Sequence, residues 1–174
     1  CNKLYGPADF KGNQTPRPYY VPDSRVINVE HTWPQSRFTG KHPADTQKSD
    51  LHHLFPTDSE LNGIRSSYPF GEVEKDSSSL KCGQSRFGIN MLARGPVFEP
   101  PDAHKGRVAR ALFYFALRYD TKIDPVQEAT LRSWHQMHPV DAEELLRNDE
   151  IYKAQGNRNP FIDHPELVSS IQDF

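Results

Sequence analysis

The chain has 174 residues, a length that fits one folded domain and leaves little room for a second, so we treat residues 1–174 as a single domain. Its 21 basic and 23 acidic residues give a formal charge of -2, which excludes a general electrostatic attraction to a polyanion. Any binding of nucleic acid must therefore depend on a local site. Fifteen prolines and ten glycines argue against an all-helical bundle, and we expect no membrane association because no apolar run is long enough to cross a bilayer.

Two strands are predicted in the first third of the chain. Residues 25–30 (RVINVE) are rich in β-branched side chains and favour a strand that delivers Glu30 and His31 at its end. A polar loop is expected over residues 40–50, and residues 51–55 (LHHLF) are short and apolar enough for a second strand. A strand end is a rigid place to mount reactive side chains.

A helix is predicted directly after the second strand. Thr57 or Asp58 can accept hydrogen bonds from the exposed N–H groups of its first turn. The helix would carry Asn62, and Arg65 follows by three positions, so both side chains lie near one helix face. The expected order is strand, loop, strand, helix.

The second half of the chain is predicted to be mostly helical. Residues 69–101 read as loops with one strand near residues 87–92. In residues 102–119 apolar side chains recur at spacings of three and four, which is typical of a core helix. Pro125 sits at the first turn of a further helix, and residues 140–154 predict another. The fold class is therefore α+β.

One group of residues has the chemistry of a hydrolytic metal site. A hard cation such as Mg²⁺ prefers oxygen ligands, which Glu30 and the amide of Asn62 supply. His31, with an ordinary pKa near 6.5, is a suitable general base for a water molecule beside that cation. On spacing alone, however, a Glu-His pair and an Asn near a helix start are more often structural.

Four motifs add information that spacing alone does not give. They are residues 30–36 (EHTWPQS), 50–57 (DLHHLFPT), 62–66 (NGIRS) and 155–161 (QGNRNPF). In this order they resemble the bacterial endonuclease I family, which belongs to the ββα-metal nucleases. The resemblance implies an α+β fold with a ββα-metal core, additional helices and long loops.

The same resemblance implies an activity and a location. The family cuts DNA without sequence preference and with a divalent metal, which leaves 5′-phosphate and 3′-hydroxyl ends. Carried over to this chain, His31 is the general base and Glu30 and Asn62 hold Mg²⁺, for which Mn²⁺ or Ca²⁺ could substitute. Double- or single-stranded DNA is the expected partner, RNA is left open as a second substrate, and no obligate protein partner is predicted. Secretion or a periplasmic location is implied.

Other positions are assigned to support of the site or to substrate binding. Strand alternation would place His52 and His53 on opposite faces, and we assign His52 to the site. Arg65, Arg107 and Arg110 are candidate phosphate contacts, although solvated surface positions are the alternative. The chain also departs from the pattern, since many family members have Asn at the position of His53. The loop before the second strand is short and lacks the arginine that steadies the phosphate in relatives.

Two questions stay open at this level. The count of two cysteines is compatible with one disulfide or two free thiols, and the resemblance favours a Cys1–Cys82 disulfide. For function, the alternatives are a nucleic-acid-binding module without catalysis and a phosphodiesterase for small molecules. The complete trio of Glu30, His31 and Asn62 argues against loss of catalysis.

Overall fold

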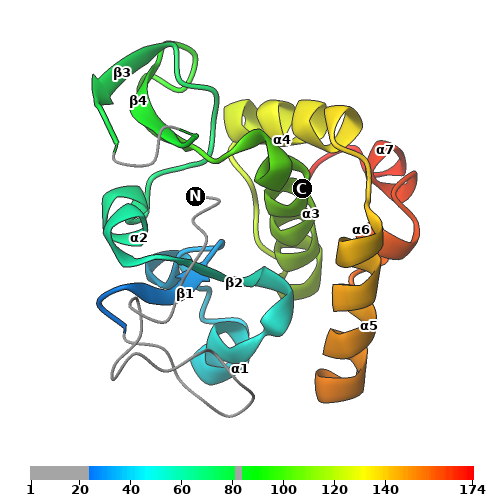
Figure 1. Cartoon of the computed structure of the whole chain (residues 1–174). Helices are drawn as coiled ribbons and strands as arrows, with labels where there is room; N and C mark the ends of the chain where they lie inside the picture. Colours follow the sequence, from blue (N-terminus) through cyan, green and yellow to red (C-terminus); the bar gives the residue numbers. More distant parts are fainter. Residues whose placement is uncertain (1–23, 81–83) are drawn as a thin grey trace.

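The computed structural model describes residues 24–80 and 84–174 (Figure 1). The predicted Cys1–Cys82 disulfide lies outside these residues and stays a prediction. The described elements, in chain order, are β1 (Ile27–His31), the 3-10 helix η3 (Gln35–Arg37), α1 (Ala44–Ser49), the 3-10 helix η4 (Leu51–His53), β2 (Leu54–Asp58), α2 (Ser59–Arg65), β3 (Lys75–Ser78), β4 (Arg86–Asn90), β5 (Gly95–Glu99), α3 (Asp102–Tyr119), α4 (Pro125–Met137), α5 (Ala142–Gln155), α6 (Pro160–Asp163) and α7 (Leu167–Ser170).

The ββα unit predicted for the first third of the chain is present. Strands β1 and β2 pair antiparallel, with Glu30 opposite Phe55 and His31 opposite Leu54. Helix α2 begins directly after β2, and Asp58 is its N-cap, because Asp58 Oδ1 accepts hydrogen bonds from the first exposed N–H groups of the helix. The predicted order of strand, strand and helix is confirmed, and it brings α2 beside the end of β1.

The boundary of the second strand was predicted wrongly. Residues 51–53 form the 3-10 helix η4, and the strand starts only at Leu54. The turn arises at Asp50, whose carboxylate accepts hydrogen bonds from His52 N and from Tyr114 and Tyr119 of α3. A tertiary contact therefore produces a turn in a segment whose apolar residues predicted an extended strand. The loop expected over residues 40–50 likewise contains the short helix α1.

A second sheet, of three strands, lies at one end of the molecule (Figure 1). The strand predicted near residues 87–92 corresponds to β4, which pairs antiparallel with β3 on one side and β5 on the other. Strand β5 was not predicted, since Gly95 and Pro96 read as a turn. Proline is compatible with β5 because this strand is at the edge of the sheet, where one side of the backbone needs no ladder partner.

Helix α3 is the centre of the fold, between the ββα unit and helices α4 to α7 (Figure 1). It spans residues 102–119 as predicted, and Phe113 and Phe115 within it are fully buried. Trp134 of α4 is also completely buried, and Trp33 stacks on Phe115 at a ring distance of 5.1 Å. Both tryptophans are core residues. The helices predicted after Asp124 and over residues 140–154 are confirmed as α4 and α5.

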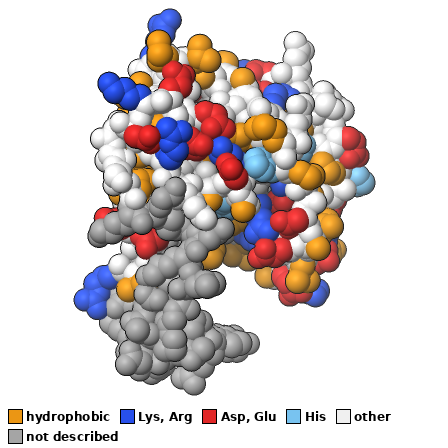
Figure 2. Space-filling model, turned by 45° about the horizontal axis from the view of Figure 1, so that its top comes forward, with side chains coloured by type: hydrophobic (Ala, Val, Ile, Leu, Met, Phe, Trp, Pro, Cys, Tyr) orange, Lys and Arg blue, Asp and Glu red, His pale blue; other side chains and the backbone are white. Residues whose placement is uncertain are grey.

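The surface is electrostatically mixed. Figure 2 shows Lys and Arg side chains interspersed with Asp and Glu over the face that it presents. This distribution agrees with the formal charge of -2. No helix in the described ranges is long and apolar enough to span a membrane.

Candidate active site

The end of β1 and the first turns of α2 border an open groove of about 370 Å³. Glu30, His31 and Asn62 all line it, so the fold brings the predicted trio together. The 3-10 helix η3 and the segment after α2 form the two rims, which carry short polar side chains: Gln35, Ser36, Ser66 and Ser67.

His31 is held by one ring nitrogen and exposes the other. Its Nε2 lies 3.1 Å from the carbonyl oxygen of Lys48, and because a carbonyl can only accept, Nε2 must carry the hydrogen. In a neutral ring Nδ1 then carries the lone pair, and Gln35 Nε2 donates a long hydrogen bond to it at 3.3 Å. Burial lowers the pKa of His31, so the ring is neutral near pH 7. This nitrogen can accept a proton.

The neighbour that supports His31 is His53, and our assignment of His52 to this role is wrong. The His53 ring meets the His31 ring edge-on at 5.4 Å, and its Nε2 donates to the Gln47 carbonyl at 2.8 Å. His52 instead donates to the carbonyl of Asn157 and packs on a tyrosine of α3. Strand alternation did not apply, because both histidines are in the 3-10 turn η4. Burial lowers the pKa of His53 to about 4.

Glu30 is a buried carboxylate with an incomplete set of partners. Arg65 Nη1 lies 2.8 Å from Glu30 Oε1, but the guanidinium directs its hydrogens to the carbonyls of His31, Thr32 and Ser66. Glu30 Oε1 is therefore buried within the described structure without a hydrogen bond. Burial raises the pKa of Glu30 to about 7, against the lowering effect of Arg65. A further cation would stabilise this carboxylate.

Asn62 presents an oxygen to the same groove. Its Nδ2 donates to Asn28 Oδ1 at 2.8 Å and to the Val29 carbonyl at 3.3 Å, and the carbonyl acceptor fixes which end of the amide is nitrogen. The amide oxygen is not engaged by these bonds. One carboxylate and one amide oxygen fit Mg²⁺, which typically keeps several waters and takes one or two protein ligands plus phosphate oxygens.

The three arginines assigned to substrate binding have other roles. Arg65 is buried and holds the backbone after β1 together with Glu30. Arg110 is buried in a bidentate pair with Glu144, at 2.8 and 2.6 Å, so it belongs to the core. Arg107 Nη2 lies 2.8 Å from the carboxylate of Asp141, the N-cap of α5, and 2.8 Å from that of Glu143 within α5. The spacing of arginines along a helix indicates that they share a face. It does not show whether a carboxylate already neutralises their charge.

Sequence reasoning missed Gln35, Asn28 and the carbonyl of Lys48. Gln35 lies within the first motif, four residues after His31, which was a usable signal. Asn28 precedes Glu30 by two positions, and alternation in a strand places both on one face. The Lys48 carbonyl carried no signal, since a backbone group has no sequence signature.

Comparison with known proteins identifies one matching family and several similar nucleases. The family model described as Endonuclease I matches residues 2–166. An extracellular ribonuclease of Bacillus subtilis is 34% identical over 165 residues, covering 83% of this chain and 53% of that protein. Endonuclease-1 of Buchnera aphidicola subsp. Baizongia pistaciae is 32% identical over 115 residues, covering 66% and 46%. A periplasmic deoxyribonuclease of Aeromonas hydrophila is 32% identical over 117 residues, covering 67% and 48%.

The fold and the site define an α+β protein built on a ββα unit, with an imidazole, a carboxylate and an amide in one groove. The chain belongs to the endonuclease I family. It spans about half the length of the curated relatives it matches.

Proposed function

We propose that the protein is a metal-dependent, sequence-nonspecific endonuclease that hydrolyses the phosphodiester bonds of DNA. One observation carries the proposal: His31 is anchored through Nε2 and turns its basic Nδ1 to the groove that also holds Glu30 and Asn62. A base next to two hard oxygen ligands suits activation of water against a phosphodiester.

In the proposed reaction His31 Nδ1 takes a proton from a water molecule as that water attacks phosphorus. The bond from phosphorus to the 3′ oxygen breaks, and the leaving oxygen takes a proton from a second water molecule, which leaves a 3′-hydroxyl and a 5′-phosphate. Glu30 and Asn62 would hold Mg²⁺, which neutralises the charge that develops on the phosphate and on the leaving oxygen. Arg65 keeps Glu30 in place through its contacts at 2.8 and 3.0 Å with Glu30 and the His31 carbonyl. No covalent intermediate is required.

The choice of substrate follows from what the groove offers. Its rims carry small hydroxyl and amide groups that suit contacts with a sugar-phosphate backbone, which contains little sequence information. Two of the relatives are named ribonuclease and deoxyribonuclease, so we include RNA beside DNA. The names extracellular and periplasmic support a secreted or periplasmic location.

A plasmid assay tests the proposal. Supercoiled plasmid is incubated with the protein in Mg²⁺, in chelator, and in chelator followed by Mg²⁺, Mn²⁺ or Ca²⁺. We expect nicked and linear products with Mg²⁺, none in chelator, and recovery on metal addition. A parallel reaction with bis(p-nitrophenyl) phosphate separates the alternatives. Binding of plasmid without cleavage would indicate an inactive module, and turnover of the small ester alone would indicate a small-molecule phosphodiesterase.

A further inference from the structure

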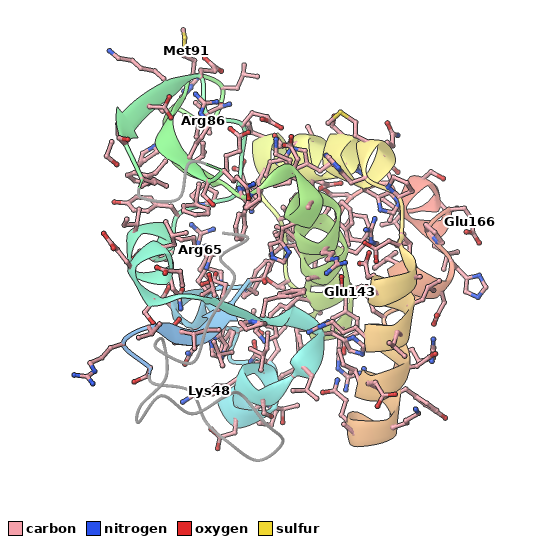
Figure 3. All side chains as sticks on the ribbon, in the orientation of Figure 1. Lys48, Arg65, Arg86, Met91, Glu143 and Glu166 are labelled. Atoms are coloured by element: carbon pink, nitrogen blue, oxygen red, sulfur yellow. The ribbon has the colours of Figure 1, made fainter. Side chains whose placement is uncertain are left out.

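A second cavity, of about 470 Å³, opens beside the catalytic groove. Glu30, Asn62 and Arg65 line both spaces, so the cavity adjoins the groove at these side chains. Its volume is in the range of sites that bind small molecules. Figure 3 labels two residues of its lining, Arg65 on α2 and Glu143 on α5.

Part of the cavity wall is apolar and rich in rings. Side chains from β2, α2, β5 and the start of α3 contribute, together with the segments that precede β3 and α3. The main apolar members are Phe55, Leu61, Phe70, Phe98, Pro100 and Pro101. Flat aromatic rings and prolines suit a flat, weakly polar ring better than a charged group.

The charges around the cavity do not select a phosphate. Arg65 is already paired with Glu30, and Arg107 with Asp141 and Glu143. Burial lowers the pKa of His104, the remaining basic side chain of the described lining, so its ring is neutral. A phosphate would therefore meet carboxylates and no free cation in this part of the lining.

Four side chains of the lining each have one buried polar atom without a hydrogen bond within the described structure: Glu30 Oε1, Arg65 Nε, Ser85 Oγ and Arg107 Nε. Ser85 is only 4% exposed. Buried polar groups are normally paired, so these atoms indicate a ligand with its own donors or acceptors. The edge of a nucleobase offers both.

We propose that this cavity binds a base of the nucleotide next to the scissile phosphate, an inference that rests on the proposed nuclease function. The backbone lies in the groove, and the base leaves the stack to enter the apolar space. The free-energy cost of unstacking and unpairing a base is lowest in a strand that is already single. The enzyme therefore cuts single strands and unpaired positions faster than continuous duplex.

Ala103 offers a way to fill the cavity without touching the catalytic trio. It lines the cavity from the first turn of α3 and is itself exposed, so Ala103→Trp adds bulk with little demand on the core. Ala103→Leu gives an intermediate volume. Ala129→Trp is the matched control, because Ala129 is an exposed alanine of α4 that lines neither space. Melting temperatures of all variants check the fold.

The substrate is a single-stranded oligonucleotide with one phosphodiester among phosphorothioate linkages. It is compared with versions that carry an abasic residue directly 5′ or 3′ of that linkage. We expect one abasic version to lower kcat/KM of the parent protein about tenfold. Ala103→Trp should lose about tenfold on the intact strand and nothing further on that abasic strand, because the two changes remove the same contact. Ala129→Trp should behave like the parent.

The outcomes separate the subsite from the nuclease activity. Equal rates of the parent protein on intact and both abasic strands would overturn the subsite while the nuclease stands. Equal losses of Ala103→Trp on every strand would also overturn it, since the tryptophan would then be blocking the backbone. Failure of the parent protein to cut any strand or plasmid in Mg²⁺ would overturn the proposed function, and the subsite with it.

Discussion

Glu30 carries a negative charge at a place where burial disfavours it. Arg65 Nη1 compensates part of this cost at 2.8 Å from Glu30 Oε1, yet this contact lacks hydrogen-bond geometry, and burial raises the pKa of Glu30 to about 7. A carboxylate that served only stability would be expected to have its hydrogen bonds completed by the protein. At the residue scale, this incomplete pairing is the main structural support for a cation beside Asn62.

The two candidate ligands can be tested by metal titration. Glu30→Gln and Asn62→Ala each remove an oxygen ligand, so we expect the Mg²⁺ concentration for half-maximal cleavage to rise by about tenfold or more. Glu150→Gln is the control, because this exposed carboxylate pairs with Lys153 and lines neither the groove nor the cavity. Unchanged titrations for both ligand variants would show that neither residue binds the metal.

His53 makes stability depend on pH. Its pKa is about 4 in the folded protein and near 6.5 when unfolded, so the unfolded state binds more protons between these values. Stability from the neutral ring is complete above pH 6.5 and is lost as the pH falls toward 4. From pH 7 to pH 5 we expect a loss of about 2 kcal/mol in unfolding free energy that His53→Asn does not show. Urea unfolding of the parent and of the variant at both pH values measures this loss. Equal losses of unfolding free energy in the two proteins would contradict the prediction.

At the scale of elements, helix α2 positions Asn62 and depends on one cap. Asp58 Oδ1 accepts from Glu60 N at 3.0 Å and Leu61 N at 3.2 Å. Asp58→Ala should cost about 1 kcal/mol of stability, the usual value for an N-cap. It should also raise the Mg²⁺ requirement, because the first turn of α2 carries the amide ligand.

Asp124 provides the matched control for that prediction. It caps α4 in the same way, at 2.9 Å to Val126 N and 3.3 Å to Gln127 N, and it does not line the groove. Asp124→Ala should lose similar stability in thermal or urea unfolding and keep the parent's metal titration. If Asp58→Ala also keeps the parent titration, α2 does not position a metal ligand.

The elements also show how far sequence reasoning reaches. Helices such as α3 were predictable because a repeated spacing of apolar residues records which face is buried. The turn η4 was not, because it depends on Asp50 meeting Tyr114 and Tyr119, about 65 residues away in sequence. The trio in the groove followed from motifs, whereas the choice between His52 and His53 required that turn.

The whole molecule has no net positive charge, and many of its arginines are paired with carboxylates. In the proposed function, nucleic acid is then bound through a small number of phosphate contacts, which carry no direct sequence information. We expect sequencing of cut ends from a random duplex library to give a nearly flat base distribution. Raising the salt concentration should weaken binding equally across sequences. A sharp motif at the cut sites would contradict this.

His31 is the base of the proposed nuclease reaction, and the His31→Ala variant lacks that base. The variant removes Nδ1 but leaves the groove and Arg65 in place, so we expect plasmid cleavage in Mg²⁺ to fall by about a hundredfold or more. Plasmid binding in chelator and the melting temperature should stay close to the parent values. His164→Ala, which changes an exposed histidine outside the groove, should cut normally. Cleavage by His31→Ala within about threefold of the parent rate would contradict the account.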